Sequence, residues 1–452
     1  MEAQGRGERV WFLDWLRVLA VFGVFVFHTL RPFDDGDWHV KNADRSEGIS
    51  ITIAFLGLWG LAFFFMISGA GAWLALRWRT AGGFLRERCL RLLVPFAIAY
   101  VLLSPLQYFI EERHKGTSSG APTTFFGDLG GHAPLWLRDT YHLWFLVYLL
   151  QFAVLGLPVF LWLRSRPRRW IPNRRGSILL LALPLVPIHL LLLAAPGPEH
   201  GWGEFVFFFD FFVVGFLVMS DERLVAAVRR DAVYGLVLGA GAFVLGVVTG
   251  IIDFLEGWWE DPGYSWAYLW YSPLITLAVW GWLVAVLGFG MRLPAFNRPL
   301  PVPLARAAMP YFLVHQPVIL AIAFFVVGWN AGLWTKYAVL LPAAFLVSAV
   351  LAWALSVVPG VSMLFGGETS GPGEHGRDGS KKHPLRHHMV SNLEVRRSST
   401  EQDPRTKEMR DGIDRHEGRG GAETRRGVRL RHRPGPLHRV AGERDRRTPR
   451  RR

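Results

Sequence analysis

The stretch WFLDWLRVLAVFGVFVFHTL, residues 11–30, decides the fold of this chain. It is apolar and long enough to cross a bilayer as a helix, yet it contains Asp14, Arg17 and His28. Ionisable side chains inside a membrane span are costly, so each one is a functional-site hypothesis by default. Arg17 and His28 are close to three whole helical turns apart, and Asp14 lies within roughly 40° of the same line. The three side chains therefore share one face, with His28 about 16 Å along the axis from Arg17.

Further apolar segments of similar length follow this first one and predict a polytopic bundle. Such segments are long enough to span a bilayer as helices. We therefore predict an all-α integral membrane domain over residues 1–365, with about ten transmembrane helices. The ten segments are 11–30, 51–76, 92–110, 142–163, 177–195, 203–220, 233–255, 265–289, 308–329 and 336–358.

The charge of the chain is concentrated in its last part. Residues 366–452 hold 23 of the 50 Lys and Arg and 13 of the 36 Asp and Glu, which accounts for +10 of the net charge of +14. This part has few apolar residues, so it cannot bury a core, and we predict a basic, disordered cytoplasmic tail over 366–452. A basic tail binds anionic lipid or nucleic acid without specificity, but a solvated tail is the favoured reading, and we expect no specific nucleic-acid partner.

Positive charge in the loops predicts the orientation. The loops after the second, fourth, sixth and eighth segments hold 17 Lys and Arg, and the alternate loops hold seven. Because positive charge in short loops stays cytoplasmic, both termini are predicted to be inside. Arg17 then lies at the inner edge of the inner or plasma membrane, and His28 lies in the outer half.

The outer loops contain aromatic and acidic residues with two possible roles. Trp38-His39, Tyr141-His142 and the run 256–261 (EGWWED) are most simply interface anchors. The sharper alternative is a platform for a sugar. Asp34-Asp35-Gly36-Asp37 is read as a solvated loop of turn residues rather than as a metal site, and no metal is predicted.

Two groups at the inner side are candidates for binding the donor. Arg88 and Arg91 are three residues apart at the start of the third segment, where one helical turn would present both to the same side and favour a phosphate. Ser68, Gly69 and Gly71 end the second segment. For the glycines helix packing is favoured, and the alternative is a gap for a thin ligand arm.

Two histidines are candidates for proton transfer. His28 can accept a proton from a hydroxyl near neutral pH. His315 precedes Pro317, which frees a backbone carbonyl, so His315 serves either the site or that local polar group. The single cysteine, Cys89, excludes an intrachain disulfide and is read as structural.

Together these residues resemble acyltransferase family 3, a family of integral membrane enzymes. The resemblance covers about residues 11–365 and rests on Arg17 and His28 separated by ten residues, on Arg88-x-x-Arg91 and on Phe64-Phe65-x-x-Ser68-Gly69. His142-Leu143-Trp144 and His315-Gln316-Pro317 also resemble family features. Phe12-Leu13-Asp14 and Trp38-His39-Val40 are most similar to the glucan biosynthesis protein C branch, which is implicated in succinylating glucans.

The resemblance implies an acyl-CoA donor, acetyl-CoA or succinyl-CoA, on the cytoplasmic face and a carbohydrate or other hydroxyl acceptor on the outer face. Arg17, Arg88, Arg91 and Ser68 would hold the donor. The catalytic residues would be His28, as general base or transient acyl carrier, together with His315 and with Asp14, which would pair with Arg17.

Other classes of function compete with this one. A transporter or exporter of a glycan or lipid fits the apolar composition and the intramembrane charges equally well. A non-catalytic membrane partner that retains the fold is a second alternative. A lipid-linked sugar transferase would need a metal-binding acidic pair, for which only the Asp34–Asp37 loop is available.

Overall fold

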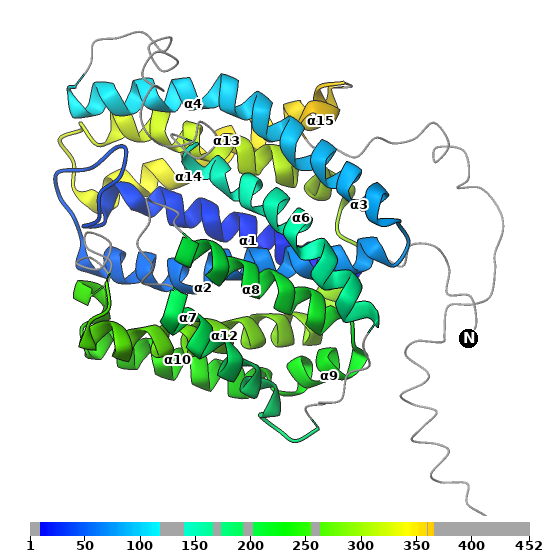
Figure 1. Cartoon of the computed structure of the whole chain (residues 1–452). Helices are drawn as coiled ribbons and strands as arrows, with labels where there is room; N and C mark the ends of the chain where they lie inside the picture. Colours follow the sequence, from blue (N-terminus) through cyan, green and yellow to red (C-terminus); the bar gives the residue numbers. More distant parts are fainter. Residues whose placement is uncertain are drawn as a thin grey trace, which may run out of the picture. The chain divides into compact units, whose positions relative to one another are not determined.

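The computed structural model describes residues 10–117, 140–165, 173–192, 202–254, 263–358 and 360–365. Every regular element in these ranges is helical, which confirms the predicted all-α class (Figure 1). The predicted tail 366–452 and the run 256–261 lie outside the described residues. The longer helices are α1 (Trp11–Leu30), α2 (Glu47–Leu76), α4 (Val94–Lys115), α6 (Trp144–Ser165), α8 (Trp202–Met219), α10 (Ala232–Val248), α12 (Trp266–Arg292), α13 (Val302–Val326) and α14 (Leu333–Val357).

The predicted spans agree with these helices, with two differences. Among the described residues, eight helical stretches are long and apolar enough to cross a membrane. One of them is the continuous helix Ala81–Lys115, formed by α3 (Ala81–Arg88), η2 (Cys89–Leu93) and α4. The predicted segment 233–255 is α10, which forms a pair bent by 61° with α9 (Glu222–Arg230). The predicted segment 177–195 corresponds to Ser177–Leu192, formed by η4 (Ser177–Leu181) and α7 (Ala182–Leu192), which is shorter than a full span.

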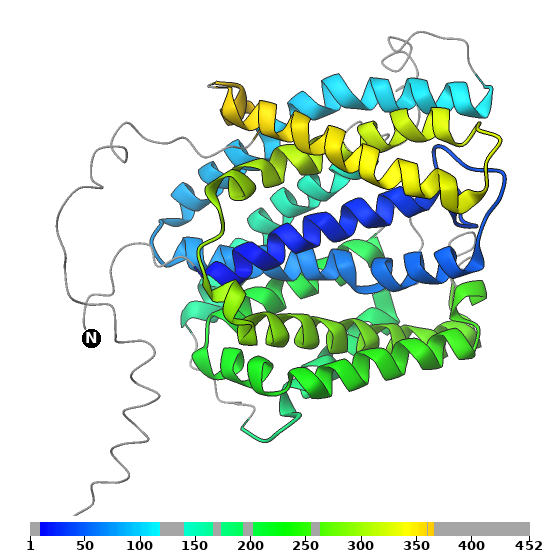
Figure 2. The same cartoon turned by 180° about the vertical axis from the view of Figure 1, so that it is seen from behind.

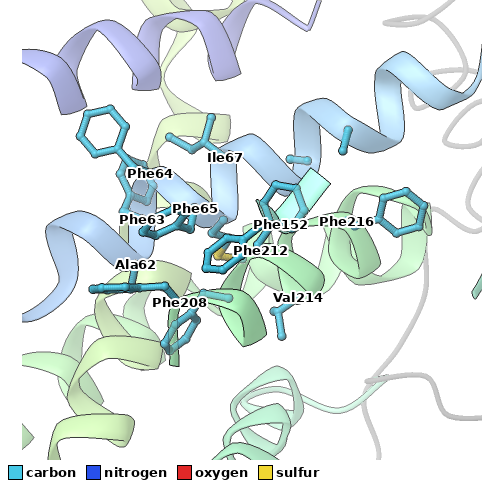
Figure 3. Close-up of a cluster of buried hydrophobic side chains, with 14 of the residues drawn as sticks. Ala62, Phe63, Phe64, Phe65, Ile67, Phe152, Phe208, Phe212, Val214 and Phe216 are labelled. Atoms are coloured by element: carbon cyan, nitrogen blue, oxygen red, sulfur yellow. The ribbon is translucent and has the colours of Figure 1, made fainter. Parts of the chain in front are cut away.

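The closest helix pairing in the core joins α2 to α8 through glycines. A Cβ added at Gly69 would lie 1.8 Å from the carbonyl oxygen of Phe212, and one at Gly215 would lie 1.9 Å from that of Met66. The two backbones therefore touch, which only glycine permits. Phe65, Phe208 and Phe212 pack around this contact (Figure 3). Gly69 is thus a packing residue, as the favoured interpretation held.

The ribbon of α1 runs between those of α14 and α2 (Figure 2), and its side chains belong to two hydrophobic clusters. Leu13 and Leu16, in its first half, belong to the large cluster built from α2, α6, α8 and α12. Phe25 and Leu30, in its second half, belong to a smaller cluster with α13 and α14. Burial of these residues fixes the rotation of α1, and this rotation decides where its polar face points.

The first outer loop is held by buried ion pairs. Asp34 is 2% exposed, accepts a bond from the Arg31 guanidinium and lies 2.6 Å from Lys41 Nζ. Asp35 and Asp37 are exposed. The predicted solvated loop is therefore wrong for Asp34, because two cations on the same loop compensate its burial. Burial lowers the pKa of Lys41, and the bond to Asp34 opposes that shift.

Candidate active site

Three histidines from three elements meet near the outer end of α1. The Nδ1 atom of His28 lies 2.9 Å from Nε2 of His315 in α13. The ring of His142, in the short helix η3 (Tyr141–Leu143), is centred 5.0 Å from the ring of His315. His142 and His315 are buried, whereas His28 is partly exposed. The structure therefore joins the two predicted histidines and adds a third.

Pro317 explains how His142 is held. A proline has no backbone N–H, so the carbonyl of Leu313, four residues earlier, loses its helical partner. His142 Nε2 lies 3.1 Å from that carbonyl oxygen and donates to it. The freed carbonyl is therefore satisfied by His142, whereas His315 bonds to the carbonyl of Phe312 at 2.6 Å. Of the two roles left open for His315, the structure therefore shows a bond to a local carbonyl, that of Phe312, and also a contact with His28.

The hydrogen-bond partners decide the proton positions on the His28–His315 pair. Nδ1 of His315 faces a carbonyl oxygen and must donate, so Nε2 of a neutral His315 is an acceptor. His28 then donates from Nδ1 to that nitrogen, and its own Nε2 carries the lone pair. Within the described ranges, Nε2 of His28 has no hydrogen-bond partner and is not fully buried, so a ligand can reach it. His28 is thus prepared to accept a proton.

Two guanidinium groups meet at the inner end of α1. A Cβ added at Gly71 would lie 3.6 Å from Arg17 Nη2 and 3.9 Å from Arg88 Nη2, so both arginines lie over this glycine of α2. Asp14 pairs with Arg17 at 3.4 Å, as predicted. Arg88 lies over the ring of Phe84 but has no hydrogen bond or ion pair to any residue that the structure describes. Two cations beside one carboxylate form a site that favours an anion.

Arg91 does not join Arg88 and Arg17. Residues 89–93 form the π-helical turn η2, in which the backbone is wider than in an α-helix, so three residues no longer complete most of a turn. Arg91 is exposed and pairs with Glu87 at 3.2 Å, and Glu87 also lies 3.0 Å from Arg79. The predicted pairing of Arg88 with Arg91 on one side is replaced by the pairing of Arg88 with Arg17.

Ser68 lies one turn of α2 from Gly71 and is partly exposed. Residues three apart on a helix share a face, so Ser68 is placed on the side of α2 that carries Gly71. Asp14 is about 21 Å along the axis from His28, so it belongs to the arginine site rather than to the histidines. The inner and outer groups are therefore two separate sites on one helix.

Some residues of the site were not among the sequence-based assignments. His142 had two signals, its place at the entrance of a span and its resemblance to a family feature, but no assigned role. Helix packing was the favoured interpretation of Gly71. Glu111 in α4 was not singled out, and it lies 2.8 Å from Nδ1 of His39. Tyr141, whose backbone is left-handed with φ of 51°, lies 3.2 Å from the same carboxylate. These contacts join residues far apart in the chain, so local pattern could not show them.

Within the described ranges, no group of three or more His, Cys, Asp or Glu side chains is arranged to hold a metal ion. The histidine trio is instead linked by hydrogen bonds to backbone carbonyls and to itself. The arrangement suits proton transfer at the outer end and anion binding at the inner end.

A family model described as an acyltransferase domain matches residues 10–356, which is most of the chain and includes both sites. The chain belongs to acyltransferase family 3. It is therefore a multi-pass membrane acyltransferase.

Curated relatives agree with this membership. The chain is 24% identical over 331 residues to a protein named glucans biosynthesis protein C from Salmonella paratyphi B, a match that covers 69% of this chain and 83% of the relative. A protein of the same name from Salmonella heidelberg is 23% identical over 324 residues, with the same coverage of both chains. No solved structure matches the chain.

Proposed function

We propose that this acyltransferase moves an acetyl or succinyl group from acyl-CoA at the inner face to a hydroxyl of a glycan at the outer face. The observation that carries the proposal is the pair of sites on α1. One end has two converging guanidinium groups, and the other has a histidine with an accessible ring nitrogen. The name of the relatives, glucans biosynthesis protein C, supports a glucan as the acceptor.

The inner site fits the charged end of the donor. Acyl-CoA carries several phosphate oxygens, and guanidinium groups recognise phosphate through paired N–H donors. Arg88 has donors left over, because Glu87 is taken by Arg79 and Arg91. Gly71 leaves room for the two guanidinium groups to approach each other. We assign binding of the donor phosphates to Arg88 and Arg17, with Asp14 limiting the cost of the second cation.

The outer site fits the transfer step. Nε2 of His28 accepts the proton of the acceptor hydroxyl while that oxygen forms a bond to the thioester carbonyl carbon. The carbon–sulfur bond breaks, and the His28 imidazolium returns its proton to the departing thiolate. The products are an ester and CoA thiol, so atoms and charge balance. His315 is a positioning residue, because it accepts from Nδ1 of His28 and stabilises the transient imidazolium.

The spacing of the sites supports a donor that reaches from one to the other. Arg17 and His28 are separated by about 16 Å along the helix. The pantetheine arm of CoA has a comparable length and ends in the thioester. In this proposal the arm lies along α1, with the phosphates at the end predicted to be cytoplasmic and the acyl group beside His28.

The test uses purified full-length protein in lipid nanodiscs with a panel of acyl-CoA donors and glucose oligosaccharides as acceptors, read by mass spectrometry of the products. We expect acylated sugar and free CoA in equal amounts, with either acetyl-CoA or succinyl-CoA preferred. His28→Ala provides the inactive control. A wild-type protein that consumes no acyl-CoA but moves glycan across the membrane would refute transfer in favour of export.

A further inference from the structure

A fourth histidine at the outer end, His39, has no role in the transfer step above. Nδ1 of His39 lies 2.8 Å from Oε2 of Glu111, to which it donates. The hydroxyl of Tyr141 donates to the same oxygen at 3.2 Å, and Nζ of Lys115 donates to Oε1 at 2.7 Å. Both carboxylate oxygens are therefore engaged, and Glu111 holds the His39 ring in one orientation and one tautomer.

This tautomer leaves Nε2 of a neutral His39 as a hydrogen-bond acceptor. The His39 side chain is 24% exposed, and Nε2 has no partner in the part of the chain that the structure describes. Nε2 of His39 is not fully buried, so a ligand can reach it. The His39 ring, held by Glu111 of α4 and in contact with Tyr141 of η3, therefore presents one open acceptor atom.

Trp38 places this acceptor beside the transfer site. Its ring is centred 5.4 Å from the ring of His39 and 6.3 Å from the ring of His28, to which it is inclined by only 12°. The ring of Tyr141 is centred 4.8 Å from the ring of His39. Two aromatic rings therefore lie next to His39, and one of them, Trp38, also lies next to His28.

The arrangement exceeds what is needed to hold the loop. Arg31, Asp34 and Lys41 already bind the loop internally, and Lys336 of α14 binds Asn42 at 2.8 Å. In contrast, Tyr141 contributes to the His39 group from a left-handed backbone with φ of 51°, which is strained for a non-glycine residue. Such strain is typical of residues held for function.

We propose that Trp38, His39 and Glu111 form the subsite for the acceptor sugar. This inference rests on the proposed function. Nε2 of His39 accepts a hydrogen bond from a sugar hydroxyl next to the one that reacts, and Trp38 and Tyr141 offer aromatic surface to the C–H faces of the ring. Glu111 is a positioning residue that acts through His39. The hydroxyl to be acylated is thereby directed to His28.

The experiment separates acceptor binding from donor binding. In nanodiscs, the KM for a glucose disaccharide acceptor, kcat at saturating acceptor and the Kd for CoA are measured for His39→Ala, Glu111→Gln and Trp38→Ala. We expect the acceptor KM to rise about 5- to 20-fold, in keeping with one lost hydrogen bond of about 1–2 kcal/mol, with the Kd for CoA unchanged. His39→Gln places an amide near the position of Nε2 and restores part of the affinity.

Two matched variants control for general effects at the outer surface. His114→Gln changes a histidine whose Nε2 accepts from the Lys41 N–H, and Trp329→Ala removes an exposed tryptophan beyond α13. Neither should alter the acceptor KM. An unchanged acceptor KM in His39→Ala, or an equal rise with His39→Gln and His39→Ala together with weaker CoA binding, overturns the subsite. A wild-type protein with no acyl transfer overturns the proposed function as well, which is a distinguishable result.

Discussion

The two ends of α1 differ in how their polar and charged side chains are paired. At the outer end, polar groups are matched to partners: His28 to His315, His39 to Glu111 and Asp34 to two cations. At the inner end, Arg17 and Arg88 converge over Gly71, and Arg88 has no ion-pair partner among the residues described. A matched network fixes the orientation of a proton, whereas two cations that share one carboxylate, Asp14, attract an anion. The same helix therefore carries two different tasks.

Among the substitutions at the two ends of α1, removal of His28 should have the largest effect on the rate of acyl transfer. His28→Ala is expected to lower kcat by about 10²- to 10⁴-fold, the usual contribution of a positioned general base. The Kd for CoA, measured by titration calorimetry, should stay within twofold because the arginine site is about 16 Å away. Activity equal to wild type in a folded His28→Ala protein would refute the role of the outer end.

Removal of Arg88 should affect the donor and spare the chemistry. Arg88→Ala is expected to raise the KM for acyl-CoA by about 10- to 100-fold, because a charge-assisted hydrogen bond contributes about 1.5–3 kcal/mol. Arg91→Ala is the matched control, since Arg91 is exposed and paired with Glu87. Equal effects of the two substitutions would show that only total charge matters at the inner end.

A change at His315 should have a smaller effect that depends on hydrogen bonding. His315→Leu removes the acceptor for Nδ1 of His28 and is expected to lower kcat by about tenfold, for a loss of about 1.4 kcal/mol. His315→Gln retains an acceptor and should recover part of the rate at an unchanged KM for acyl-CoA. Identical rates for the Leu and Gln variants would contradict the proton assignment.

The smallest effect is expected at Gly71. Gly71→Val inserts methyl groups where the Arg17 and Arg88 guanidinium groups lie, so it should raise the KM for acyl-CoA a few fold and leave kcat nearly unchanged. Gly60→Val on the same helix is the control, because a Cβ at Gly60 meets nothing within 4 Å. If both variants bind acyl-CoA like wild type, Gly71 is only a packing position.

The local sequence was sufficient to predict the helices, but not to predict which residues of different helices contact one another. Apolar length predicted the segments, and helical spacing predicted the shared face of Arg17 and His28, since both depend only on residues near in the chain. The predicted pairing of Arg88 with Arg91 was wrong, because the π turn at 89–93 changes the spacing between them, whereas the grouping of Arg88 with Arg17 was among the predictions. The roles of His142 and Glu111 depend on contacts over 171 and 72 residues, which no local pattern encodes.

Pro317 influences the histidine trio because it has no backbone N–H. Because its nitrogen carries no hydrogen, the carbonyl of Leu313 is available to His142, and α6 is thereby joined to the backbone of α13 through η3. A hydrogen bond to the backbone carbonyl of residue 313 does not depend on which side chain that residue carries. Substitutions along α13 can therefore alter its surface while the third histidine stays in place, and residue 317 alone decides whether the helix reclaims that carbonyl.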